Sequence, residues 1–119
     1  MSPWQRIKLF LQGVLSSNLG PVVFGSRRSA GWPRVRREHL KEHPTCAACG
    51  NTKSLEVHHK IPFHIAPELE LDKHNLITLC EDGPAGMNCH CLVGHRGSWR
   101  EANPNVERDA EYILTMLNQ

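Results

Sequence analysis

The hydrophobic pattern near the N-terminus has helical spacing. Apolar side chains recur three or four positions apart between Trp4 and Leu15, which predicts a helix over residues 2–18. Ser2 can cap this helix, the proline after it suits the first helical position, and Gln5 stands three residues after the cap. We expect this helix to pack against the rest of the protein through its apolar side chains.

The middle of the chain contains two short apolar segments of strand length. The segments LEVHH (residues 55–59) and NLITLC (residues 75–80) each predict a strand, and the prolines and acidic residues between them predict a loop. After the second strand, EDGPAGMN (residues 81–88) predicts a Gly/Pro loop. CHCLVGH (residues 89–95) then predicts a short helix that Asn88 can cap.

Two further helices are predicted from prolines and apolar spacing. The segment WPRVRREHLKEH, residues 32–43, opens with Pro33 and stops before Pro44, which predicts a short basic helix. Near the C-terminus Asn103 can cap a last helix and Pro104 can start it. The apolar stripe of this helix, which predicts a buried or subunit-contacting face, consists of Val106, Ala110, Ile113, Leu114 and Leu117.

Charge is distributed unevenly along the chain. The net charge of the chain is only +2, but the segment from Ser26 to Thr45 has six basic residues against two acidic ones, a local net charge of +4. A run of this kind is most often a solvated helix face, and it can also contact a nucleic-acid backbone. The six basic residues are Arg27, Arg28, Arg34, Arg36, Arg37 and Lys41.

The chain has five cysteines and eight histidines, which is many for its 119 residues. An odd number of cysteines leaves one thiol outside any complete set of disulfides. The opening residues show no clear signal-peptide cleavage site, and no stretch is long enough to span a membrane. We therefore expect a cytoplasmic protein, or one in the host cytoplasm, whose thiols are reduced and bind metal.

The cysteine spacing predicts a zinc site that clamps the open end of the strand pair. Cys46 and Cys49 form a C-x-x-C pair, which supplies two thiolates on one turn before the first strand. A second pair has to come from Cys80, Cys89 and Cys91. Cys80 ends the second strand and Cys89 begins the short helix, so these two could clamp the strand pair from its other side, while Cys91 remains an alternative to Cys89.

Four histidines flank the cysteines and are candidates for chemistry. His58 and His59 end the first strand, and the short helix bears His90 and His95. Residues five apart on an α-helix do not share a face well, so joint ligation by the helical pair requires the helix to end near Gly94. The remaining histidines are assigned no role: His39, His43, His64 and His74.

The elements CAACG, LEVHHKIPF, NLITLC and NCHCLVGH together resemble the HNH endonuclease family, in its cysteine-bearing form with a structural zinc, as in small phage or bacterial proteins. The resemblance covers roughly residues 44–97 and implies an α+β fold: a ββα-metal (His-Me) finger, here flanked by N-terminal and C-terminal helices. We expect residues 1–119 to form one domain. Its expected parts are an N-terminal helix and linker (1–25), a basic loop and helix (26–43), the HNH core (44–97) and a C-terminal helix (98–119).

The resemblance also implies roles for individual residues. His59 would be the general base, and Asn75 would complete the catalytic set by fixing the loop between the strands. His58 and His90 would be ligands of a catalytic divalent ion, and His95 matches a further histidine of some members. The eight residues between Cys80 and Cys89 depart from the family spacing, which normally has a second C-x-x-C.

The implied function is metal-dependent hydrolysis of phosphodiester bonds in DNA, by an endonuclease or a nickase that leaves 5′-phosphate ends. Its cofactors would be a structural Zn²⁺ and one catalytic divalent ion, with Mn²⁺, Ni²⁺ or Zn²⁺ favoured over Mg²⁺ by all-imidazole ligation. The basic segment, with Arg96 and Arg100, would hold double-stranded DNA by its backbone. A phage packaging terminase is a candidate partner that the sequence does not show. The alternative function is a non-catalytic zinc module that binds nucleic acid or protein.

Overall fold

Two antiparallel strands form the centre of the protein. The computed structural model describes residues 2–13 and 28–119. Strand β1 (Leu55–His59) pairs with β2 (Leu76–Cys80), with Leu55 opposite Cys80 and His59 opposite Leu76. Both predicted strands are confirmed, although β2 begins one residue late because Asn75 ends a short 3₁₀ turn, η2 (Lys73–Asn75).

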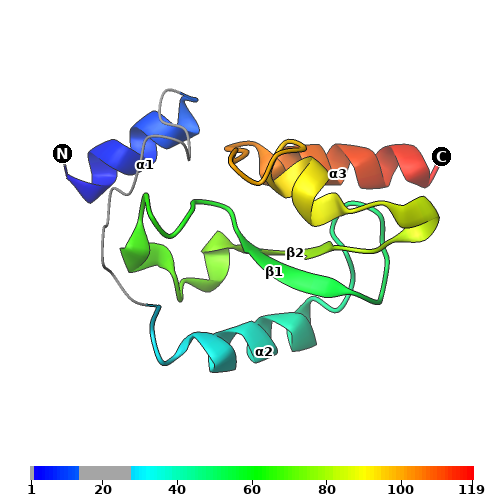
Figure 1. Cartoon of the computed structure of the whole chain (residues 1–119), viewed down its shortest axis with the longest axis horizontal. Coiled ribbons are helices and arrows are strands. Elements are labelled where there is room, and N and C mark those ends of the chain that lie inside the picture. Colours follow the sequence, from blue (N-terminus) through cyan, green and yellow to red (C-terminus); the bar gives the residue numbers. More distant parts are fainter. Residues whose placement is uncertain (1, 14–27) are drawn as a thin grey trace.

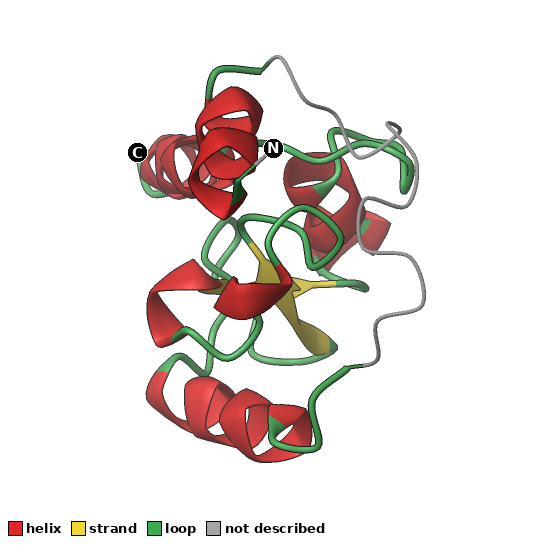
Figure 2. Cartoon of the chain, turned by 90° about the vertical axis from the view of Figure 1, so that its left-hand side faces the viewer, coloured by secondary structure: helices red, strands yellow, loops and turns green. Residues whose placement is uncertain are grey.

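Helices cover the strand pair on two sides (Figure 1). Helix α2 (Trp32–Glu42) lies on one side, where it contacts both strands. Helix α3 (Val106–Leu117) and the short helix η4 (His90–Gly94) lie on the opposite side, and η4 contacts β1, β2 and α3 (Figures 1 and 2). This is a small α+β structure with the strand–strand–helix order of the ββα-metal fold, and helices flank it at both ends.

Helix α1 (Pro3–Leu11) begins as its sequence predicts. The Ser2 hydroxyl accepts a hydrogen bond from the backbone N–H of Gln5 at 3.2 Å, and the Gln5 side-chain oxygen accepts one from the Ser2 N–H at 2.8 Å. The predicted end at residue 18 is wrong, because the helix stops at Leu11 and Gly13 takes a φ of +77°. The last part of the predicted helix, residues 14–18, lies outside the described residues.

Helix α3 begins two residues later than predicted. It starts at Val106, because the backbone before it forms a turn around the buried side chain of Asn103. The Asn103 amide oxygen accepts from the Asn105 N–H at 2.9 Å, and its amide nitrogen donates to the Val93 carbonyl and the Asp109 carboxylate. Asn103 therefore fastens the start of α3 to η4 and does not cap the helix directly.

The main core lies between β2, η4 and α3, and it contains sulfur. Three of its nine buried residues are cysteines, so the predicted zinc ligands occupy positions that aliphatic side chains take in most small domains. The nine residues are Cys46, Ala48, Ile77, Leu79, Cys80, Cys89, Val93, Val106 and Ala110.

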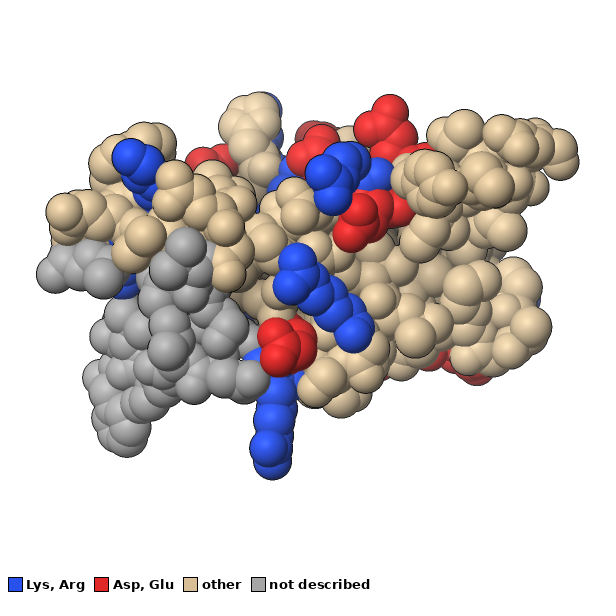
Figure 3. All heavy atoms as spheres, turned by 90° about the horizontal axis from the view of Figure 1, so that it is seen from above, with Lys and Arg blue, Asp and Glu red and all other residues tan. Residues whose placement is uncertain are grey.

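A smaller apolar cluster attaches α1 to the loop after β1. Phe10 packs with Ile65 and Ala102, and the Arg6 Nε donates to the Ile65 carbonyl at 2.7 Å. In the part of the chain that the structure describes, every helix is too short or too polar to cross a membrane. On the face seen in Figure 3, Lys and Arg side chains lie among Asp and Glu side chains and do not form a continuous basic surface.

Candidate active site and metal centre

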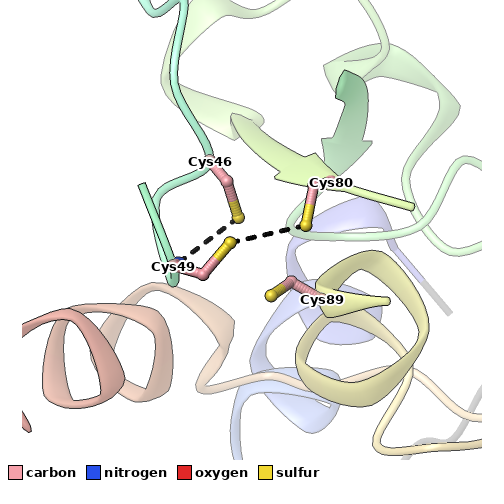
Figure 4. Close-up of side chains that lie close together, drawn as sticks. All are labelled: Cys46, Cys49, Cys80 and Cys89. Carbon is pink, nitrogen blue, oxygen red and sulfur yellow. Dashed lines mark hydrogen bonds between the residues drawn. The ribbon is translucent and has the colours of Figure 1, made fainter. Parts of the chain in front are cut away.

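Four cysteines from three separate segments surround one point (Figure 4). Cys46 and Cys49 come from the turn before β1, Cys80 ends β2, and Cys89 directly precedes η4. Their sulfur atoms all lie within 4.8 Å of one another, and the Cys49 and Cys80 sulfurs are 3.5 Å apart. Four thiolates around zinc at about 2.3 Å stand roughly 3.8 Å from each other. The cluster therefore has the size and ligand chemistry of a zinc site.

The electrostatics of two of the thiols, Cys49 and Cys89, also fit a bound cation. Burial and the neighbouring sulfurs of Cys80 and Cys46 raise the pKa of Cys49 to about 11. Burial, together with the same two neighbours, raises the pKa of Cys89 above its usual value. Thiolates crowded in the protein interior are unfavourable unless a cation compensates their charge, which a divalent ion at the centre would do.

The structure brings Cys89, and not Cys91, to the other sulfurs. Among the described residues, Cys91 belongs to neither group of clustered metal-binding side chains. Its backbone N–H donates at 2.9 Å to the side chain of Asn88, the residue predicted to cap this helix. The Cys89-His90 dipeptide can thus place its thiol in the sulfur cluster and its imidazole in the histidine cluster.

The unusual spacing between Cys80 and Cys89 is closed by a tight turn. The Gly83 N–H donates to the Met87 carbonyl at 2.7 Å, which returns the chain toward Cys80. A β-carbon at Gly83 would stand 2.9 Å from the Cys80 sulfur and 3.5 Å from the Cys49 sulfur. A glycine is required at this position because the turn passes so close to the sulfur cluster.

A second cluster consists of three imidazoles. His58 comes from β1, and His90 and His95 come from η4 and the residue after it. One ring nitrogen from each lies within 4.8 Å of the others, and the Nε2 atoms of His90 and His95 are 3.3 Å apart. Three imidazole nitrogens at this separation can bind one transition-metal ion and leave coordination positions open.

The local geometry of η4 explains how two histidines five residues apart face the same point. The segment His90–Gly94 is a π-helical turn, in which hydrogen bonds connect residues five apart, and it ends at Gly94 as predicted. His90 and His95 are therefore on one side of the turn. A β-carbon at Gly94 would stand 3.1 Å from the His58 ring, so the glycine also lets η4 approach β1 closely.

Hydrogen bonds orient two of these rings. The Glu81 carboxylate contacts His90 Nδ1 at 3.2 Å, and the Glu101 carbonyl accepts from His95 Nδ1 at 2.8 Å. Both rings then direct Nε2 toward the shared point, which is the arrangement that second-shell acceptors impose on metal-binding histidines.

His58 is the most buried of the three. Its Nε2 has no hydrogen-bond partner among the described residues, and burial, followed by the charges of His90 and His95, lowers the pKa of His58 to about 2. The ring is neutral at physiological pH and has an unshared electron pair on a buried nitrogen. A metal ion is the partner that would satisfy that nitrogen.

His59 points to the other side of β1, toward α2. Its ring lies 4.5 Å from the Trp32 ring, and its Nε2 is 2.9 Å from the Glu70 carbonyl oxygen. A carbonyl can only accept, so Nε2 has the proton and Nδ1 has the unshared electron pair. Burial lowers the pKa of His59, which keeps the ring neutral and able to accept a proton at Nδ1.

The two adjacent histidines border the same cavity although their side chains leave β1 in opposite directions. His58 and His59 are the last residues of the strand, where the cavity opens beside its end. The cavity has a volume of about 480 Å³. Besides these two histidines it is lined by Arg28, Phe63, His64, His90, His95 and Trp99, among others.

Asn75 ties the loop after β1 to the beginning of β2. Its amide oxygen accepts from the Ile61 N–H at 2.8 Å, and its amide nitrogen donates to the carbonyls of Ile61 and Leu69. Since the carbonyl of the next residue, Glu70, orients His59, this buried amide holds the segment that positions the imidazole. Asn75 is placed to position other groups.

The basic residues predicted to contact DNA are dispersed. Arg28 lines the cavity, where its guanidinium lies 4.4 Å from the Phe63 ring centroid and 3.6 Å from the Glu70 carboxylate. On α2, Arg34 pairs with Glu38 at 3.0 Å, and Arg36 pairs with Glu56 at 3.1 Å. The other four described ones, Arg37, Lys41, Arg96 and Arg100, are exposed, and Arg27 lies outside the described residues.

Several residues of the site have no recognisable signal in the sequence. Glu81 and Trp99 contact the histidine cluster, and Phe63 lines the cavity. His64, which was assigned no role, also borders the cavity, and its Nε2 is buried with no hydrogen-bond partner among the described residues. These contacts arise from the tertiary fold, and only Glu81, which directly follows Cys80, stands next to a residue that the spacing singles out.

Comparison with known proteins identifies the segment that holds both clusters. Residues 46–95 match the family model described as HNH endonuclease. This part of the chain is an HNH domain. The match begins at Cys46 and ends at His95, so the HNH domain includes every member of the sulfur and histidine clusters. Neither the curated proteins nor the solved structures that were compared gave a match to the chain.

Proposed function

We propose that the protein is a metal-dependent DNA endonuclease in which His59 is the general base. One observation carries the proposal. Within the HNH domain, a neutral imidazole whose Nδ1 has the unshared electron pair and a cluster of three imidazoles that could hold a metal ion border the same cavity. Hydrolysis of a phosphodiester needs a base for the attacking water and a positive charge at the phosphate, and these two groups can supply them.

The protein's own residues prepare the base. The Glu70 carbonyl fixes the His59 tautomer and Trp32 packs against the ring, so Nδ1 has one direction in which to accept a proton. A water molecule in the cavity, within hydrogen-bond distance of Nδ1, would transfer its proton to His59 as it attacks phosphorus. The buried position of the ring favours its neutral form before the transfer.

His58, His90 and His95 would hold the catalytic ion. A divalent ion held by these residues would supply positive charge for the phosphate and for the departing 3′ oxygen, and departure of that oxygen leaves a 5′-phosphate on the other product. The three-imidazole set favours Mn²⁺, Ni²⁺ or Zn²⁺, with Mg²⁺ as a weaker choice. The sulfur cluster would hold a separate structural Zn²⁺.

Substrate binding would depend on the phosphate backbone. Arg28 borders the cavity beside His59 and can contact a phosphate there. Four further exposed basic residues lie on α2 (Arg37 and Lys41) and in the segment after η4 (Arg96 and Arg100). Contacts of this type are mostly independent of sequence and weaken as salt rises.

A plasmid assay tests the proposal. Supercoiled plasmid is incubated with Mn²⁺ or Mg²⁺ and either the unchanged protein, His59→Ala or His74→Ala. His74 is an exposed histidine that does not line the cavity, so it is the matched control. We expect nicking or cutting by the unchanged protein and the control, and a rate about 10²- to 10⁴-fold lower for His59→Ala.

The same assay distinguishes the alternative function. His59→Ala should bind DNA as the unchanged protein does, because the substitution leaves both metal clusters in place. If no variant cuts DNA under any metal condition, the protein is a non-catalytic zinc module. If His59→Ala cuts as fast as the unchanged protein, the general base is a different group.

A further inference from the structure

Trp99 stands against the histidine cluster and is half exposed. Its ring centroid lies 5.0 Å from that of His90 and 4.8 Å from that of His95, and the side chain lines the cavity. Even so, 55% of its surface remains accessible. We propose that Trp99 stacks on a nucleobase that has left the duplex stack, next to the phosphate at the histidine cluster. This inference rests on the proposed nuclease function and specifies its substrate as DNA with an unpaired nucleotide.

The backbone holds Trp99 in place through the same turn that carries the histidines. The Gly97 N–H donates to the Cys91 carbonyl at 2.8 Å, and the Ser98 N–H donates to the His95 carbonyl at 2.9 Å. Arg96 and Gly97 both take positive φ values, +52° and +84°. A non-glycine residue in this conformation costs energy and is typically retained at functional sites, so the loop presents the indole in a defined position beside His90 and His95.

The other aromatic side chain of the cavity is already partnered. The Phe63 ring is covered by the Arg28 guanidinium at 4.4 Å, whereas the Trp99 ring packs against the His90 and His95 rings and keeps about half of its surface exposed. The cavity therefore offers an open indole beside a cluster suited to an anionic phosphate. A nucleotide has a flat aromatic base joined to a phosphate and matches both features.

The proposal requires an unpaired nucleotide because of how bases are arranged in DNA. In a duplex, both faces of each base are covered by its neighbours, so an indole outside the helix has no face to stack on. Single strands, mismatches and bulges present open base faces, and aromatic side chains that stack on them add affinity with little sequence preference. The unpaired base would also bring its own phosphate toward the histidines.

Other aromatic side chains are as exposed as Trp99 but lie outside the cavity, and they provide controls. Trp4 on α1 and Tyr112 on α3 are 67% and 66% exposed, but neither lines the cavity. The substitution Trp4→Leu therefore removes an exposed indole without touching the site. At Trp99, the pair Trp99→Phe and Trp99→Leu keeps apolar contact with the histidines, and only the Phe variant keeps an aromatic face.

The experiment measures binding, without added divalent ion so that nothing is cut. Protein that holds one zinc per chain, in the sulfur cluster and not in the histidine cluster, is titrated into three fluorescent DNAs of one sequence: a single strand, a full duplex, and a duplex with one unpaired 2-aminopurine. We expect the unchanged protein to prefer the single strand and the unpaired site over the duplex and to quench the 2-aminopurine by stacking. Trp99→Leu should lose the quenching and bind the single strand roughly 5- to 150-fold more weakly, with duplex binding unchanged.

Trp99→Phe and Trp4→Leu should retain both the preference and the quenching. Equal affinity of the unchanged protein for single strand and duplex would overturn the proposal without any variant. Equal losses in Trp99→Leu and Trp99→Phe, or a parallel loss of duplex binding, would show that Trp99 only packs. Because these readouts need no cleavage, they fail independently of the nuclease assay with His59→Ala.

Discussion

At the scale of single residues, the hydrogen-bond partner of one ring nitrogen in each imidazole determines whether the other nitrogen can accept a proton or bind a metal ion. His59 and His95 both donate to backbone carbonyls, whereas His90 meets the carboxylate of Glu81, and His58 has no partner for Nε2 among the described residues. The carbonyl at His59 leaves the unshared electron pair of that ring on Nδ1, and the acceptors at His90 and His95 direct Nε2 of these two rings toward each other. Tautomer and orientation thus support the proposed division between a general base, His59, and the metal ligands.

The Glu81 carboxylate should strengthen the histidine cluster as a metal site. Because it accepts from His90 Nδ1, it fixes the ring and makes the opposite nitrogen a better ligand. We expect Glu81→Ala to weaken Ni²⁺ or Zn²⁺ binding at this cluster roughly 10- to 100-fold. Glu81→Gln should lose less, because its amide oxygen can still accept. Calorimetric titration of protein whose sulfur cluster already holds zinc measures this.

The matched control for this titration is Asp82→Ala, an exposed carboxylate on the next residue whose backbone carbonyl, and not its side chain, accepts from Asn51. The control should bind the ion as the unchanged protein does. Equal weakening in Asp82→Ala and Glu81→Ala would mean that overall negative charge, rather than the hydrogen bond to His90, sets the affinity.

At the scale of elements, the sequence predicts local structure well, but it predicts tertiary contacts between distant segments poorly. The capping box at Ser2, both strands and the end of η4 at Gly94 depend on a few neighbouring residues, and the structure confirms them. The π-helical form of η4 was not predicted, because apolar periodicity does not distinguish it from an α-helix over five residues. The late start of α3 depends on Asn103 reaching Val93, a tertiary contact that no local pattern announces.

In the candidate site, too, features that depend on local sequence were predicted and tertiary contacts were not. The cysteine spacing predicted the sulfur cluster, with Cys91 as an alternative to Cys89, and the resemblance to the HNH family implied the set of three histidines. The structure brings the members of both clusters together. The contact of His59 with Glu70 spans eleven residues through an irregular loop, and its exact partner follows only from the folded loop. Trp99 likewise reaches the site because the turn at Gly97 folds back, which a pattern of apolar residues does not show.

The loop that carries Glu70 should depend on the buried amide of Asn75. Asn75→Ala leaves the Ile61 N–H and two carbonyls without their partner, and we expect a loss of about 2 to 3 kcal/mol in unfolding free energy. Asn75→Asp should lose at least as much, because it keeps the acceptor but places a carboxylate oxygen against the carbonyls of Ile61 and Leu69. Urea unfolding with zinc present measures both variants.

An exposed asparagine provides the comparison for that experiment. Asn118 follows α3 at the surface, and Asn118→Ala should change the unfolding free energy by less than about 0.5 kcal/mol. If Asn75→Ala is as stable as this control, the amide does not hold the loop, and Glu70 must be positioned by its own contacts with Ser29 and Arg28.

At the scale of the whole molecule, the sulfur cluster connects segments that the paired strands β1 and β2 alone cannot hold together. Its four cysteines join the turn before β1, the end of β2 and the start of η4, and three of them belong to the main core. A two-stranded sheet is marginal by itself, and the rest of the core is small. Structural zinc sites supply folding free energy of about the same size as the total stability of a small domain.

Removing zinc should therefore unfold the core, and the two neighbouring cysteines provide a test. Cys89→Ser removes a sulfur of the cluster, whereas Cys91→Ser changes a thiol outside it two residues away. We expect Cys91→Ser to purify with one tightly bound zinc and a cooperative thermal transition, and Cys89→Ser to lose both. Metal analysis and circular dichroism measure them. The opposite result would place Cys91 in the cluster and turn η4, with His90 and His95, away from His58.

A strong chelator should abolish the thermal transition of the unchanged protein. Without the ion that compensates their charge, the sulfur atoms that line the core cannot pack stably.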